Sequence, residues 1–103
     1  MEFLNKIELK GVVGKINYAD VGEDTKVTFS LVTEHVTETK LIETTWFECV
    51  GFFTQVPTNN GRIQKGDHAH VVGRLRIRRY TDADGNEMKL NEVVVQSLEK
   101  IED

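Results

Sequence analysis

Apolar and polar residues alternate with a period of two through most of this chain, which restricts its fold to β-structure. The clearest case is the stretch Gly73-Arg74-Leu75-Arg76-Ile77-Arg78-Arg79-Tyr80. Successive side chains of a strand point to opposite faces, so Leu75 and Ile77 are predicted to face a core. The other face would carry Arg74, Arg76, Arg78 and Tyr80. Guanidinium groups and a ring can bind the phosphates and bases of single-stranded nucleic acid, although a solvated strand face has the same composition.

The same alternation predicts five strands, at about residues 4–14, 25–34, 43–53, 68–80 and 87–98. Asp84-Gly85 predicts a hairpin turn between the last two strands. The predicted inward side chains include Val13, Val27, Phe29, Leu31, Ala69 and Val71.

Residues 54–66 form the one long stretch without a strand pattern. Pro57 and Gly61 are poor residues for a helix interior, so we expect a turn or one short helix there. Glycines at positions 11, 51 and 73 interrupt strand patterns, which predicts sharp bends or close backbone approach. Together these features predict an all-β fold, a five-stranded OB-fold barrel with a short turn or helix between strands three and four.

Length and composition limit the architecture and the compartment. A chain of 103 residues is predicted to form one domain, residues 1–103, that buries about 60–70% of its surface. Cys49 is the only cysteine, which excludes an intramolecular disulfide framework. Residues 1–6 lack the features of a secretion signal, and no apolar stretch approaches membrane-spanning length. We therefore expect a cytoplasmic protein.

The charge of the chain is unevenly distributed. The net charge is −4, yet residues 62–79 hold six Lys or Arg residues against the single acid Asp67. A binding groove needs only a local excess of positive charge, so the acidic total does not exclude nucleic acid as a partner.

The chain resembles the bacterial single-stranded DNA-binding protein family over nearly its whole length. Glu43-Thr44-Thr45-Trp46 is similar to the family's entry to strand three, and Val71 to Asp82 is similar to its fourth strand and following hairpin. The similar segments are residues 5–14, 27–33, 43–46, 65–67, 71–82 and 92–95. Their order and spacing together make the resemblance specific.

The resemblance implies sequence-independent binding of single-stranded DNA in replication, recombination or repair, by a homo-oligomer that is a dimer or tetramer. It implies base stacking by Trp46, Phe52 and Tyr80. It implies phosphate contacts from Lys6, Arg76 and Arg78, with Arg74 and Arg79 as further candidates. A core or subunit contact also fits Trp46 and Phe52, which share a strand face with Val50, and simple solvation also fits Lys6.

The chain departs from the family's pattern at several places. Residues 34–45 contain no stacking aromatic, and Glu48 stands where the family commonly has a basic residue. Phe47 replaces a frequent histidine that is associated with subunit contacts. The sequence ends at residues 100–103 without the linker and acidic tail of the family, so we expect no partner recruitment through such a tail.

Other chemistry is weakly indicated. Asp67, His68 and His70 match no standard metal-ligand spacing, and Cys49 is predicted to be a buried, unreactive thiol. We therefore predict no enzyme, no cofactor and no metal site. Two alternatives remain open: a dimeric accessory protein resembling primosomal replication protein B, and an OB-fold module that binds only proteins.

Overall fold

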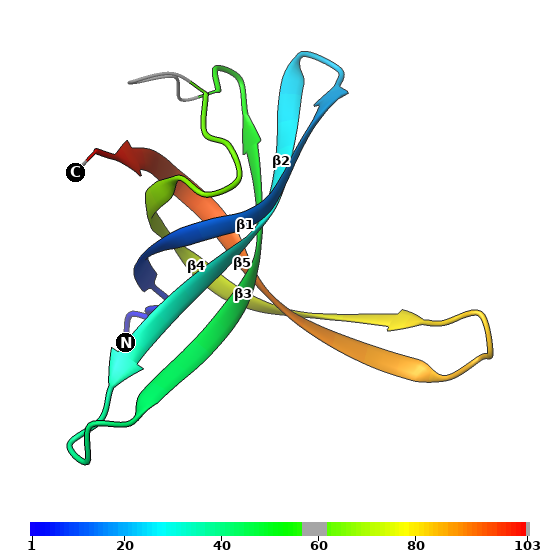
Figure 1. Cartoon of the computed structure of the whole chain (residues 1–103). Coiled ribbons are helices and arrows are strands. Elements are labelled where there is room, and N and C mark those ends of the chain that lie inside the picture. Colours follow the sequence, from blue (N-terminus) through cyan, green and yellow to red (C-terminus); the bar gives the residue numbers. More distant parts are fainter. Residues whose placement is uncertain (57–61, 103) are drawn as a thin grey trace.

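The computed structural model describes residues 1–56 and 62–102, and these residues form a closed barrel of five strands. The strands are β1 (Ile7–Val21), β2 (Asp24–Val36), β3 (Ile42–Phe53), β4 (His68–Thr81) and β5 (Glu87–Ile101). They are hydrogen-bonded in the order β1-β2-β3-β5-β4, and pairing of β1 with β4 closes the barrel (Figure 1). Of these paired strands, β3 and β5 are parallel, and the other four pairs are antiparallel. The predicted all-β fold class is confirmed.

The first strand is longer than predicted. Residues 7–12 pair with β4, and after a register shift between Val13 and Ile16 the strand continues along β2 to Val21. The shift changes which residues face inward, from Val13 to Ile16 and Tyr18, all of which pack in or against the core. The alternation therefore breaks at the irregularity, and the predicted strand, residues 4–14, stopped there.

The described part of the connector between β3 and β4 packs against the barrel. Ile63 is buried in the core, and its carbonyl accepts a hydrogen bond of 2.7 Å from the Tyr18 hydroxyl. The Arg62 guanidinium lies 4.0 Å from the centre of the Tyr18 ring. Gln64 to Asp67 form a turn with a backbone hydrogen bond of 3.0 Å. The predicted turn is confirmed, the described part of the connector contains no helix, and residues 57–61 lie outside the described residues.

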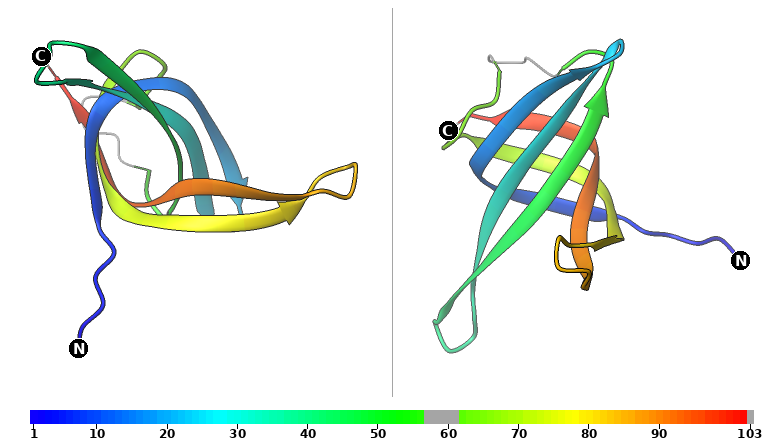
Figure 2. Two further views of the ribbon diagram at one scale, coloured as in Figure 1. Left: turned by 90° about the horizontal axis from the view of Figure 1, so that it is seen from below. Right: turned by 90° about the vertical axis from the view of Figure 1, so that its right-hand side faces the viewer.

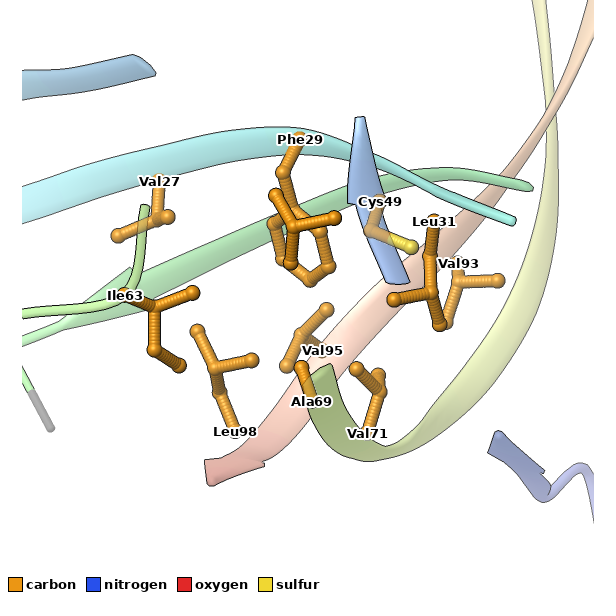
Figure 3. Packing of buried hydrophobic residues seen from close by; sticks show 11 residues of the cluster. Val27, Phe29, Leu31, Cys49, Ile63, Ala69, Val71, Val93, Val95 and Leu98 are labelled. Atoms are coloured by element: carbon orange, nitrogen blue, oxygen red, sulfur yellow. The ribbon is translucent and has the colours of Figure 1, made fainter. Parts of the chain in front are cut away.

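The core fills the barrel with side chains from all five strands, and most of these side chains are aliphatic (Figure 3). The exceptions in the buried cluster are Phe29 of β2 and Cys49 of β3. The inward faces predicted for β2 and for the first half of β4 are confirmed. The buried residues from these predictions are Val27, Phe29 and Leu31 of β2 and Ala69 and Val71 of β4, and Val13 of β1 is buried as predicted too. None of the described residues forms a helix long and apolar enough to cross a membrane.

Leu75 and Ile77 correct the prediction for β4. Both were expected in the core, yet they are 44% and 58% exposed. The β1–β4 pairing ends at Ile7 and Gly73, and the β3–β5 pairing ends at Glu48 and Glu92, opposite Arg76. Beyond Arg76 and Glu92, β4 and β5 continue as a two-stranded hairpin that projects from the barrel (Figure 2). Within residues 1–56 and 62–102, β5 is the only strand that pairs with β4 beyond Gly73. Leu75 and Ile77 therefore stay exposed although the apolar alternation continues.

Gly11 and Gly73 lie where strands approach closely. A β-carbon at position 11 would lie 2.2 Å from the carbonyl oxygen of Val32, and one at position 73 would lie 2.1 Å from that of Val94. These distances confirm the predicted close backbone approach and explain why the barrel can bend tightly at both positions.

Candidate nucleic-acid interface

The strand register brings most of the predicted site residues onto one face of the barrel. Ser30, Glu48, Glu92 and Arg76 form a row across β2, β3, β5 and β4. Because every second residue shares a face, this row defines a surface that we call the outer face. Its further members are Trp46, Val50 and Phe52 of β3 and Arg74, Arg78 and Tyr80 of β4.

The three predicted stacking rings are accessible. Trp46 is 59%, Phe52 55% and Tyr80 43% exposed, although each carries a large apolar surface. A core position is therefore wrong for Trp46 and Phe52 in this chain. An exposed ring fits base stacking, and it also fits a contact between subunits.

Trp46 borders a depression at the β1 irregularity. A β-carbon at position 14 would lie 2.6 Å from the Cζ3 atom of Trp46 and 2.7 Å from the Oγ atom of Ser30. Glycine at this position therefore lets the indole lie against the β1 backbone. The depression, which we call the Trp46 pocket, is lined among others by Gly14, Lys15, Ser30, Trp46, Glu48 and Lys65.

A second depression continues across the outer face. We call it the Phe52 pocket, and its lining includes Lys26, Phe52, Arg76, Arg78, Leu90 and Glu92. Lys26 Nζ lies 5.9 Å from the Phe52 ring centre, within the range of a cation–π interaction. Thr28 and Glu48 line both pockets, so the two depressions adjoin each other on β2 and β3.

Glu92 holds the arginines of the Phe52 pocket, and sequence reasoning missed this role. Arg76 donates to Glu92 Oε1 through Nε at 2.9 Å and Nη2 at 2.5 Å, and Arg78 Nε lies 3.4 Å from the same oxygen. Glu92 is only 7% exposed, so its charge needs these partners. The available signal was an acid directly before the apolar run Val93-Val94-Val95. The two cations are thus fixed on the outer face while one negative charge offsets part of their field.

The remaining predicted basic residues are dispersed. Arg74 shares the outer face with Arg76, whereas Arg79 lies on the opposite face of the hairpin, where its Nη1 is 3.6 Å from Glu87 Oε1. Lys6 precedes β1 by one residue and is exposed. Tyr80 lies beside Arg78, with 5.7 Å between the guanidinium carbon and the ring centre.

Two other titratable groups have defined environments. Burial, and secondarily the charge of Glu48, raises the pKa of Cys49 to about 12, so the thiol stays protonated at neutral pH as predicted. His70 Nε2 lies 2.6 Å from Glu8 Oε2. This hydrogen bond, together with the charge of the histidine, lowers the pKa of the Glu8 carboxyl.

The closed barrel and its ring-bearing, arginine-bearing outer face define an OB-fold protein. Comparison with known sequences agrees, since the model of the Single-strand binding protein family matches residues 4–101. The chain belongs to this family.

Two relatives illustrate the similarity. The sequence is 30% identical over 109 residues to Single-stranded DNA-binding protein 1 of Xylella fastidiosa (strain 9a5c), covering 98% of this chain and 79% of that protein. The structure resembles that of the Plasmodium falciparum SSB complex with ssDNA, with a TM-score of 0.81 and 22% identity. That similarity covers 99% of this chain and 98% of the other, and it supports the fold.

Proposed function

We propose that this protein binds single-stranded DNA on its outer face, largely independently of base sequence. The observation that carries the proposal is the pair of adjoining depressions, the Trp46 pocket and the Phe52 pocket, which combine exposed rings with guanidinium groups held by Glu92. Stacking on a ring contributes about 1–3 kcal/mol per base, and every base offers a flat face. Phosphates between stacked bases meet the cations beside the rings.

This geometry supports the following individual contacts. Trp46, Phe52 and Tyr80 stack bases, and Arg74, Arg76 and Arg78 contact phosphates along β4. Lys6 extends the positive surface beside β1. Arg79 contacts the bound DNA only where the DNA wraps around the edge of the β4–β5 hairpin. Glu92 keeps Arg76 and Arg78 in place before DNA arrives, which reduces the ordering cost of binding.

The family assignment supports the wider role. The Xylella relative is named a single-stranded DNA-binding protein, and the Plasmodium structure is a complex with single-stranded DNA. We infer a non-catalytic function in replication, recombination or repair in the cytoplasm, performed by a homo-oligomer. We also infer one domain over residues 1–103, which the core cluster of the described residues supports.

A titration with oligo-dT tests the proposal. Binding is expected to quench the emission of Trp46, the only tryptophan, and duplex DNA of equal length is expected to bind much more weakly. Trp46→Ala is expected to weaken binding by about 5- to 150-fold, the equivalent of one stacked base. Phe3→Ala is the control, since Phe3 is an exposed ring that precedes β1 and is outside the strands of the outer face. Light scattering of this variant checks that its assembly equals that of the wild type.

The results also separate the alternatives. Unchanged emission and no mobility shift at high protein concentration would contradict DNA binding and favour a module that binds only proteins. Equal affinity for duplex and single strand would leave electrostatic attraction alone and exclude stacking as the mechanism.

A further inference from the structure

Glu48 occupies the centre of the outer face. Its side chain is exposed, it lines both the Trp46 pocket and the Phe52 pocket, and it is paired across β3 and β5 with Glu92. Glu92 is matched by Arg76 and Arg78, but no ion pair holds Glu48 within residues 1–56 and 62–102. A surface suited to a polyanion therefore presents an uncompensated carboxylate at its middle.

The ligand that complements this carboxylate is a donor group, because a phosphate at the same place would be repelled. Bases of a single strand expose their Watson–Crick edges to a protein. Guanine presents two adjacent donors, N1–H and the N2 amino group, which match the two oxygens of a carboxylate. Thymine has one donor between two carbonyl oxygens, while adenine and cytosine place a ring-nitrogen acceptor beside their amino group.

Resting on the proposed function, we propose that Glu48 is a specificity-determining residue that reads the edge of a base stacked on Trp46 and favours guanine. Glu48 follows Trp46 by two residues on the same strand face, a separation of about 7 Å along the strand. A base lying on the indole can direct its edge toward Glu48 at this separation. The preference applies to one nucleotide of the bound strand, so the other contacts stay independent of sequence.

The Trp46 pocket supplies the other contacts that such a nucleotide needs. Lys15 and Lys65 line it, so ammonium groups are available for the phosphates on either side of the bound base. Ser30 lies across from Glu48 on β2, and its hydroxyl accepts a hydrogen bond of 3.0 Å from the Lys15 backbone N–H. Ring, cations and carboxylate thus surround one depression of the outer face.

The test compares three oligonucleotides of equal length: all-thymidine, the same strand with one central deoxyguanosine, and the same strand with deoxyinosine there. Inosine keeps N1–H and lacks the N2 amino group. The wild-type protein is expected to bind the guanine strand at least about fivefold more tightly than the all-thymidine strand, with inosine between them. Glu48→Gln is expected to abolish this order while binding to all-thymidine is retained or strengthened.

Glu23→Gln is the matched control, since it makes the same change in charge at the exposed turn between β1 and β2. It is expected to keep the guanine preference. Equal wild-type affinity for the three strands, or an unchanged preference in Glu48→Gln, would overturn the role of Glu48 and leave the proposed function intact. Failure to bind any of the three strands would overturn the proposed function, and this inference with it.

Discussion

Glu48 and Glu92 are neighbouring carboxylates of the outer face with opposite surroundings. Glu92 is buried and shares one oxygen between Arg76 and Arg78, whereas Glu48 is exposed. The first acid positions cations, and the second reduces the positive field where DNA is proposed to pass. The net attraction for phosphate therefore depends on single carboxylates as well as on the number of arginines.

Replacing Glu48 by arginine tests where the DNA lies. Glu48→Arg is expected to strengthen binding to oligo-dT and to add about one phosphate contact, which steepens the log–log salt dependence by roughly 0.7 for a single strand. Affinity measured at several salt concentrations gives the slope, and Glu23→Arg is the control. Unchanged affinity and slope with assembly intact would place Glu48 outside the DNA path.

The hydrogen bond between His70 and Glu8 makes stability depend on pH in a defined direction. The bond lowers the pKa of Glu8 below its usual value of 4.5, so its contribution to folding is present above that pH and is lost as pH falls below it. Glu8→Gln is expected to lower the melting temperature at pH 6, with a smaller difference from wild type at pH 3.5. An equal difference in melting temperature between the variant and the wild type at both pH values would contradict the link between Glu8 ionisation and stability.

At the scale of elements, two glycines on neighbouring strands have different roles. At Gly73 a β-carbon would meet the Val94 backbone oxygen at 2.1 Å, whereas at Gly14 it would meet the Trp46 side chain at 2.6 Å. A backbone obstacle cannot rotate away, but an exposed indole can. The β4 position therefore affects folding and the β1 position affects the binding surface.

The pair Gly73→Ala and Gly14→Ala tests this distinction. Gly73→Ala is expected to lower the free energy of unfolding by about 1–3 kcal/mol through overpacking. Gly14→Ala is expected to leave stability nearly unchanged, shift Trp46 emission and weaken oligo-dT binding severalfold. Denaturant unfolding and fluorescence titration of both variants measure the effects. Similar losses of stability in both would show that the Gly14 contact is structural.

At the scale of the whole molecule, apolar surface remains uncovered outside the barrel. Ile77 and Leu75 are exposed on the hairpin, and Phe3 and Leu4 are 90% and 87% exposed before β1. Asn5 holds this segment to the hairpin, since its side chain exchanges two hydrogen bonds with the Leu75 backbone at 2.7 and 3.0 Å. Such exposed side chains favour association of copies.

Light scattering at tens of micromolar protein tests the proposed homo-oligomer. The expected mass is at least twice the 11.7 kDa of the chain. A twofold mass would fit the dimeric alternative and a fourfold mass a tetramer. A mass of one chain at this concentration would contradict self-association.

The sequence alone determined the fold class, the inward faces of β2 and most of the composition of the outer face. Alternation is a property of the local backbone, so it placed Phe29 and Leu31 inside and Arg76 and Tyr80 outside without knowledge of the neighbours. Gly73 likewise carried a local signal of close approach, which the structure confirms.

Only the tertiary structure decided where the core ends and which charges meet. Leu75 and Ile77 continue the apolar pattern, but whether they are covered depends on where β1 begins. Its first residue, Ile7, pairs with Gly73, so the later part of β4 lacks β1 as a neighbour. Glu92 and Arg76 are distant in sequence and meet because β4 and β5 pair in one register. Burial and ion pairing depend on contacts between segments that are separated in the sequence. The pattern of residues within one segment does not show which other segment packs against it.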